Sequence, residues 1–241
     1  MAYRYATEHV DHSDLASGCV LRSAPGRPGF PVRLASELFQ RAAAHVGNGP
    51  VALWDPCCGS GHLATVVGLL HRDRLAYVLA TDVDTDAVGI AERNLGLLTA
   101  HGLAEREREL RWAAAEFGRP AFLERAEAAR RLAADLARLG GDLSHTVRVG
   151  DAFRPAVPER PVDVVLTDVP YGGLTRWVGE PADEDPVVEL LRALASALPD
   201  HAVLAVVARA RKVAVSGVRV LERVRVGNRA AAVLRAADLR R

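Results

Sequence analysis

The sequence predicts an α/β fold with a mostly parallel seven-stranded sheet that ends in an antiparallel hairpin and carries an inserted helical hairpin. Short apolar runs of strand length alternate with helical patterns, which is typical of a parallel sheet crossed by helices. Near the end of the chain, two runs of strand-forming residues flank the turn Gly227-Asn228, which predicts an antiparallel pair. A strand–helix–strand unit needs roughly 30 residues, and the chain between the second and third strands has about 40 more than that.

Composition narrows the class of protein. The chain has 241 residues, of which 49% are hydrophobic, enough for a sizeable core. The net charge is only +1, yet ten basic and two acidic residues lie between Arg209 and Arg241. Such a patch suits a polyanionic partner, and a solvated arginine-rich edge explains it equally well.

Three cysteines without a C-x-x-C pair predict neither a disulfide framework nor a zinc site. The chain has no apolar run of membrane-spanning length and no signal-peptide pattern at its start. We therefore expect a cytoplasmic protein with no metal site and no membrane segment, and we expect a monomer.

Residues 1–30 are polar and rich in turn formers, so we expect an N-terminal extension with one short strand at Gly18 to Leu21. Residues 31–241 should form one domain. Its first helix begins after Pro31 and ends near Gly47. The expected strands are 51–54, 76–81, 146–149, 163–167, 201–208, 218–226 and 230–236. The expected helices are 60–70, 87–98 with Asp84 or Thr85 as cap, and 186–198.

The surplus residues predict a helical insertion at about 103–141. Two helical patterns are separated by a break at Gly118 to Pro120 and closed by Gly140 and Gly141. The mixed charges between Glu105 and Arg111 are typical of a solvated helix face. A role in contacting a substrate remains the alternative.

The stretch V-A-L-W-D-P-C-C-G-S-G-H-L-A at residues 51–64 predicts a strand, a tight loop and a helix N-terminus, where backbone N–H groups face a ligand. Its G-S-G-H-L-A segment fits the dinucleotide-binding pattern, and Asp82 stands near the position expected of a ribose-binding acid. A nicotinamide-dependent oxidoreductase would satisfy this pattern equally well.

Three further strand ends favour a different cofactor. They are D-P before the glycines, V-G-D-A-F at residues 149–153 and D-V-P-Y-G-G at residues 168–173. The order D-P-C-C-G-S-G, T-D-V-D, G-D-A and D-V-P-Y resembles that of the Rossmann-like class I methyltransferases that use S-adenosylmethionine to modify nucleic-acid bases. The resemblance covers residues 31–241 without the insertion. More narrowly, the chain resembles the avilamycin-resistance ribosomal RNA methyltransferases. This resemblance implies methylation of a guanine of large-subunit ribosomal RNA and resistance to an orthosomycin antibiotic such as avilamycin.

The resemblance also implies the cofactor-binding residues. Asp55 would lie near the methionine part of S-adenosylmethionine, and Gly59 and Gly61 would let the backbone approach the cofactor. Asp82 would accept hydrogen bonds from both ribose hydroxyls, since a carboxylate can bind a diol in this way. Asp151 would accept the adenine amino group. For the glycines, a simple tight turn is the alternative.

By the same resemblance, Asp168, Pro170 and Tyr171 form the catalytic end of a strand. Asp168 could accept the hydrogens of an exocyclic amine or take the N1 proton of guanine. Tyr171 would offer a face on which an extruded base stacks. Val169 stands where the family's amino-methyltransferase motif usually has a proline, although its carbonyl could still accept a hydrogen bond. An ordinary strand-end turn is the alternative.

The loop that follows contains Arg176, which would meet a phosphate, and Trp177, which would contact a base or pack against the protein. Together with the basic C-terminal segment, these residues favour structured RNA as the substrate. Three alternatives remain open at this stage: a methyltransferase for another nucleic acid or a small molecule, a non-catalytic RNA-binding module, and the oxidoreductase.

Overall fold

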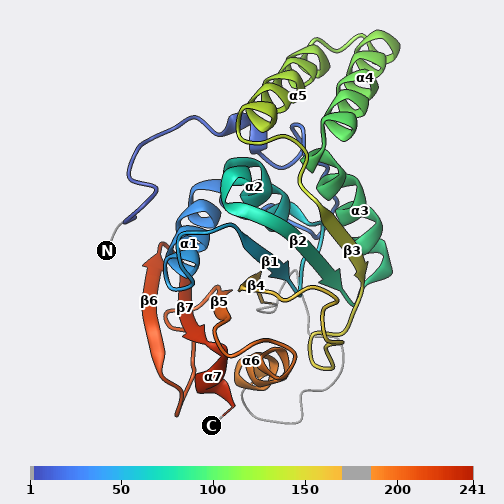
Figure 1. The fold of residues 1–241 in the computed structure, drawn as a ribbon. Coiled ribbons are helices and arrows are strands. Elements are labelled where there is room, and N and C mark those ends of the chain that lie inside the picture. The colour runs from blue at the N-terminus through green and yellow to red at the C-terminus, as the bar shows by residue number, and fades with distance from the viewer. Residues whose placement is uncertain (1–2, 170–185, 241) are drawn as a thin grey trace.

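The computed structural model describes residues 3–169 and 186–240 (Figure 1). Seven strands form a single sheet in the order β3-β2-β1-β4-β5-β7-β6. The five strands β1 to β5 pair in parallel, and β7 runs antiparallel to both β5 and β6. The predicted sheet is therefore confirmed, including its antiparallel end. The strands are β1 (Val51–Asp55), β2 (Leu75–Asp82), β3 (His145–Val149), β4 (Val164–Asp168), β5 (Val203–Ala208), β6 (Val220–Val226) and β7 (Arg229–Arg235).

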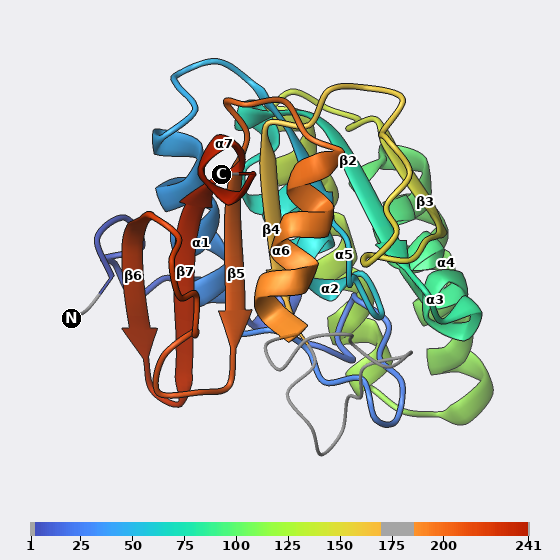
Figure 2. The same cartoon turned by 90° about the horizontal axis from the view of Figure 1, so that it is seen from below.

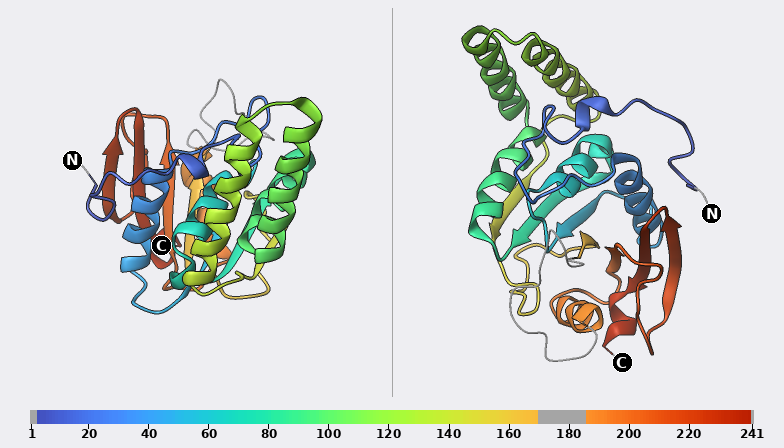
Figure 3. Two further views of the ribbon diagram at one scale, coloured as in Figure 1. Left: turned by 90° about the horizontal axis from the view of Figure 1, so that it is seen from above. Right: turned by 180° about the vertical axis from the view of Figure 1, so that it is seen from behind.

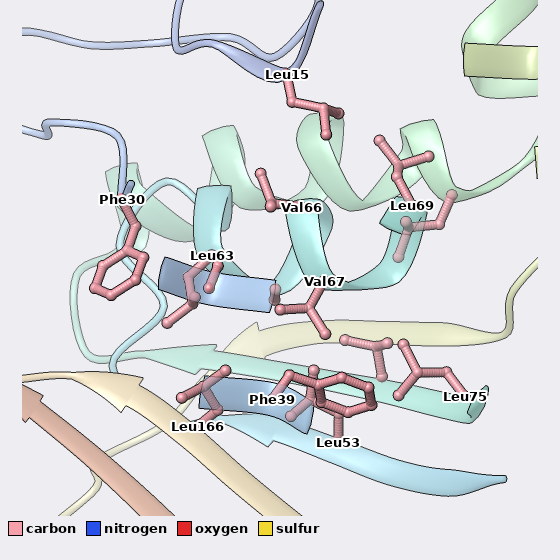
Figure 4. Packing of buried hydrophobic residues seen from close by; sticks show 14 of the residues in the cluster. Leu15, Phe30, Phe39, Leu53, Leu63, Val66, Val67, Leu69, Leu75 and Leu166 are labelled. Atoms are coloured by element: carbon pink, nitrogen blue, oxygen red, sulfur yellow. The ribbon is translucent and has the colours of Figure 1, made fainter. Parts of the chain in front are cut away.

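Helices cover both faces of this sheet (Figure 1). One face carries α1 (Val32–Ala44), α2 (His62–Leu70) and α3 (Thr85–Leu95), and the other carries α6 (Pro186–Ser196) and α7 (Ala236–Leu239). Every residue of β1 and β5 is buried, as expected of central parallel strands that are covered on both sides. Figure 4 shows Leu53 and Leu166 of the sheet packed beneath Phe39 of α1 and Leu63 of α2.

The expected strand at Gly18 to Leu21 is wrong. This stretch is a turn in which the Gly18 N–H donates to the Leu21 carbonyl at 2.9 Å, with a positive φ of 84° at the glycine. Val20 and Leu21 are fully buried, but Val20 offers its carbonyl to the Arg106 side chain at 2.9 Å. Because these backbone groups are paired within the turn or with the Arg106 side chain, they need no neighbouring strand.

The rest of the N-terminal segment is also tied to the domain. Glu37 of α1 is fully buried and accepts the backbone N–H groups of Arg4, Tyr5 and Ala6 at 2.6 to 2.8 Å. Burial acts to raise the pKa of Glu37, but these bonds and one from Arg41 hold it below its ordinary value. A short 3-10 helix, η1 (Ser13–Leu15), brings Leu15 above α2, as Figure 4 shows. The segment thus forms a covering layer without regular strands.

The predicted helical hairpin is present as α4 (Ala100–Phe117) and α5 (Ala121–Arg138). Gly118, with a φ of 60°, ends α4, and α5 follows Pro120. The two helices lie side by side and project from the domain (Figure 1). Their connection lies on the same side of the molecule as the carboxyl ends of the strands (Figures 2 and 3). Ion pairs such as Arg111–Glu107 lie along this hairpin, in agreement with the predicted solvated face.

Two further 3-10 helices, η2 (Arg72–Arg74) and η3 (Gly96–Leu98), connect the main elements. Asp84 caps α3 by accepting the N–H groups of Asp86 and Ala87, as the sequence predicts. Within the described part of the chain, no helix combines the length and the apolar character needed to cross a membrane.

Candidate functional site

Four predicted carboxylates meet at one edge of the sheet. Asp55, Asp82 and Asp168 are the last residues of β1, β2 and β4, and Asp151 follows β3. Since these strands are parallel, their carboxyl ends share an edge, where open α/β sheets bind ligands. The acidic groups are close enough that Asp82 and Asp168 both influence the protonation of Asp55.

The two glycines of the loop after β1 have different environments. Both have positive φ, 52° at Gly59 and 72° at Gly61. A Cβ at Gly61 would lie 2.7 Å from Cδ1 of Leu95 and 3.0 Å from Cα of Ala91, so this glycine allows α3 to pack closely. A Cβ at Gly59 would meet no atom within 4 Å. Gly59 therefore borders the open side of the loop.

Asp82 is held by backbone donors on both sides. Its Oδ2 accepts the Gly59 N–H at 2.7 Å, and its Oδ1 accepts the Asp84 N–H at 3.0 Å. Each carboxylate oxygen can accept a second hydrogen bond. The carboxylate is thus fixed in place and still able to bind a diol.

Asp55 lies beneath this loop, with only 1% of its surface exposed. Its Oδ1 accepts the Cys57 N–H at 3.4 Å. Burial raises the pKa of Asp55 to about 8, and the neighbouring carboxylates of Asp82 and Asp168 act in the same direction. At neutral pH the group is therefore mostly protonated, and it supports the loop from below.

Asp151 is exposed, and its Oδ1 accepts the Phe153 N–H at 2.9 Å, which closes the turn after β3. Asp151 also lines a depression, together with Trp54 and Thr81. The indole Nε1 of Trp54 donates to the Thr81 hydroxyl at 3.0 Å and fixes one wall of this depression.

Asp168 has the least satisfied carboxylate of the four. Its Oδ1 is buried and has no hydrogen-bond partner among the described residues, and its Oδ2 lies 3.9 Å from a guanidinium nitrogen of Arg229. Burial raises the pKa of Asp168 to about 6, although Arg229 and Arg209 act to lower it. At neutral pH this group is mostly ionised, with a proton affinity suited to general-base chemistry.

The remaining predicted residues follow Asp168. The Val169 N–H donates to the Val207 carbonyl at 2.9 Å, and the Val169 side chain is 1% exposed in the core. Only its backbone carbonyl is therefore a candidate for contact with a ligand. The predicted residues Pro170, Tyr171, Arg176 and Trp177 lie outside the described residues.

Two residues of the site were missed in the sequence. Arg229 is the first residue of β7 and faces Asp168.

The second missed residue, Asn94 of α3, is fully buried. Its side-chain amide donates to the carbonyls of Ser60 at 2.8 Å and Arg22 at 2.9 Å, and it accepts the Arg22 N–H at 2.7 Å. It ties the glycine loop to the N-terminal segment. Its position next to Leu95, on the apolar side of the predicted helix, was an available signal for a buried polar group.

Basic side chains of the C-terminal segment lie in two kinds of environment. Arg235 and Arg240 donate to backbone carbonyls of the protein. Arg209, Arg211 and Lys212 are exposed just after β5, at the edge that carries Asp168. A polyanion would therefore meet basic side chains next to the acidic site. Among the described residues, no group of three or more His, Cys, Asp or Glu side chains is placed to hold a metal ion.

The chain is similar to known proteins over nearly its full length. The family model described as rRNA methyltransferase AviRa matches residues 1–229. A curated relative from Streptomyces viridochromogenes, named 23S rRNA (guanine(2535)-N(1))-methyltransferase, is 54% identical over 99% of this chain and 97% of its own length. Two solved structures of the rRNA methyltransferase aviRa from that organism are 53% identical with a TM-score of 0.93. The alignments cover 100% and 99% of this chain and 98% of each solved chain. These matches include the N-terminal segment and the helical hairpin, and the chain belongs to the AviRa family of rRNA methyltransferases.

Proposed function

We propose that this chain transfers a methyl group from S-adenosylmethionine to N1 of a guanine in 23S ribosomal RNA and thereby confers resistance to an orthosomycin such as avilamycin. The identity of 54% with a relative whose name states this reaction supports the assignment. The observation that carries it within the structure is Asp168, a carboxylate at the carboxyl edge of the sheet with a raised pKa and one oxygen unpaired among the described residues. Family membership decides against the nicotinamide-dependent oxidoreductase.

The residues at the edge fit S-adenosylmethionine. Gly59 leaves open space where a Cβ would otherwise project, and Asp82 keeps lone pairs for the two ribose hydroxyls. Asp151, exposed after β3, would accept the adenine amino group. The acidic edge complements the positive charges of the sulfonium and the amino group. Asp55 would act through the loop that it supports.

Methylation at N1 of guanine requires a base, because this nitrogen carries a proton. Asp168, whose Oδ1 has no hydrogen-bond partner among the described residues, would accept that proton. When bound, S-adenosylmethionine supplies an activated methyl group, which bonds to the N1 electron pair while the sulfur keeps the electrons of the broken bond. The protein therefore has to align N1 with the methyl carbon and hold the proton.

The RNA would be held by basic side chains near this edge. Arg209, Arg211 and Lys212 would contact phosphates and supply affinity, while the extruded base would supply specificity. Tyr171, Arg176 and Trp177 are further candidates from the sequence. We assign these functions to a methyltransferase domain at residues 31–241, with residues 1–30 as an extension and a helical insertion at about 103–141.

Transfer of tritiated methyl groups to protein-free 23S RNA, 16S RNA and DNA tests this proposal. We expect transfer to 23S RNA alone. Reverse transcription of the product should stop at one guanine, because a methyl group at N1 blocks base pairing whereas a single methyl group at N2 does not. No transfer to 23S RNA, or transfer without a stop, would contradict the proposal.

The non-catalytic alternative predicts a different outcome in cells. If the chain acted only by binding RNA, Asp168→Ala would leave avilamycin resistance intact. If it acts by methylation, Asp168→Ala removes resistance while binding to 23S RNA remains. Drug susceptibility and RNA binding of the same variant separate the two functions.

A further inference from the structure

Arg229 faces the same side of the sheet as Asp168. Asp168 pairs with Val207 of β5, which pairs with Ala231 of β7, two residues after Arg229. Paired residues, and residues two apart in a strand, point to the same face. Because β7 runs antiparallel to β5, its first residue lies at the carboxyl edge. The topology therefore brings a guanidinium from the end of the chain to the reacting carboxylate.

The surroundings of Arg229 differ from those of a structural arginine. Arg229 is 9% exposed, its Nε is buried without a partner among the described residues, and its one ion pair there is the 3.9 Å contact with Asp168. Arg41 is similarly buried, yet it forms short bonds to Glu37 at 2.7 Å and Glu222 at 2.6 Å. A buried guanidinium with unused donors is costly unless a ligand engages it.

Phe30 restricts where these donors can point. Its ring centroid lies 5.1 Å from the guanidinium carbon of Arg229, a distance typical of a cation–π contact. Phe30 is itself buried in the core beside α2, as Figure 4 shows. The guanidinium is therefore held between an aromatic ring and the Asp168 carboxylate.

We propose that Arg229 binds O6 of the target guanine while Asp168 takes the N1 proton, so that the pair recognises the N1–H and O6 edge of the base. This inference rests on the proposed function. Guanine presents a donor at N1 beside an acceptor at O6, whereas adenine presents an acceptor beside a donor. A carboxylate next to a guanidinium complements the first pattern and opposes the second.

The same contact assists the reaction. When the N1 proton passes to Asp168, the negative charge left on the base is shared between N1 and O6. A guanidinium that donates to O6 stabilises this charge before the N1 electron pair forms its bond to the methyl carbon. Arg229 thus acts on the base directly, and its effect should depend on the atom at position 6.

A chemical substitution at that atom tests the inference. RNA fragments carrying guanosine, 6-thioguanosine or inosine at the target position would be methylated by the wild-type protein, Arg229→Met and Arg229→Lys. Arg235→Met is the matched control, since Arg235 lies on the same strand and donates to backbone carbonyls. Sulfur is a weak acceptor, whereas inosine keeps both N1–H and O6.

We expect 6-thioguanosine to lower kcat/KM of the wild type and of Arg235→Met about 10- to 100-fold, the range for a hydrogen bond to a charged group. Arg229→Met should be slow with both bases and show little further loss with sulfur. The effect of sulfur on the acidity of N1 is the same for every variant, so it cancels when the ratio of kcat/KM for guanosine to kcat/KM for 6-thioguanosine is compared between variants. Inosine should affect the wild type and Arg229→Met equally. If the methionine variant unfolds, Arg229→Lys takes its place: its shorter ammonium group keeps the charge but donates less well to O6, so its loss on sulfur substitution should be smaller than that of the wild type.

Three results would overturn the inference. In the first, an active Arg229→Met loses as much kcat/KM with 6-thioguanosine as the wild type does. The partner of Arg229 is then not O6. In the second, calorimetry shows a loss of S-adenosylmethionine affinity of tenfold or more with the sulfur effect unchanged, which assigns Arg229 to the cofactor. In the third, the wild type fails to methylate N1 of the guanosine RNA, which overturns the proposed function as well.

Discussion

The two halves of the carboxyl edge differ in how their polar groups are satisfied. At the ends of β1 and β2, both oxygens of Asp82 accept backbone N–H groups, and the buried amide of Asn94 holds the glycine loop from behind. At the end of β4 and the start of β7, Asp168 Oδ1 and Arg229 Nε are buried without partners among the described residues. After the roles proposed for them, we call these the cofactor half and the reaction half.

This difference is informative because a buried polar group without a partner costs free energy. The bonds of the cofactor half fix its geometry before any ligand binds. The reaction half instead leaves one acceptor and one donor without a partner among the described residues. Substitutions in the reaction half should therefore change rates, whereas substitutions in the cofactor half should change cofactor affinity and stability.

The largest effect is expected from Asp168→Asn. Loss of the base should lower kcat about 10²- to 10⁴-fold, the range for general-base catalysis, while S-adenosylmethionine affinity changes little. Methyl transfer to 23S RNA and calorimetry with the cofactor measure the two quantities. Equal losses of rate and of cofactor affinity would remove the distinction between the halves.

Asp82→Ala should have a smaller effect, and on cofactor affinity instead of on the rate. Two hydrogen bonds from the ribose to a carboxylate would be lost, so that cofactor affinity should fall about 10- to 100-fold. The rate at saturating cofactor should change far less. Asp82→Asn serves as the control, since it keeps the shape and one acceptor. A large fall in kcat with unchanged affinity would place Asp82 in the reaction half.

The two glycines of the cofactor half should separate stability from binding. Gly61→Ala forces a Cβ against Leu95 and Ala91 and should destabilise the protein by about 2 to 3 kcal/mol. Gly59→Ala meets open space and should cost only about 1 kcal/mol, from its positive φ. Its methyl group would, however, occupy space proposed for the cofactor. Thermal melts and calorimetry on both variants test this, and similar results for the two would contradict it.

The pH dependence of the reaction half should be the mildest effect. Burial raises the pKa of Asp168 to about 6, and only its ionised form can accept the N1 proton. The rate should therefore be constant near neutral pH and fall as the pH drops through about 6, approaching tenfold per unit. The residual rate of Asp168→Asn should lack this limb. Measurements of kcat between pH 5 and 8 with saturating RNA would show whether the limb belongs to Asp168.

Much of the fold and half of the site could be predicted because both depend on local sequence and on strand order. Periodicity located every strand of the sheet, and parallel strands necessarily bring Asp55, Asp82 and Asp168 to one edge. The expected strand at Gly18 to Leu21 was wrong because the partner of its backbone is distant in the sequence. Its burial was readable from its apolar residues, but the partner of its backbone was a distant side chain, Arg106.

The sequence by itself therefore determined the α/β fold, the glycine loop and the carboxylates, because each follows from a repeating pattern or a strand end. Only the tertiary structure decided that Gly61 serves helix packing while Gly59 faces open space, since both have the same turn geometry locally. Only the tertiary structure placed Arg229 opposite Asp168. That contact depends on β7 returning antiparallel beside β5 and on burial against Phe30, and neither leaves a signal in the residues around Arg229.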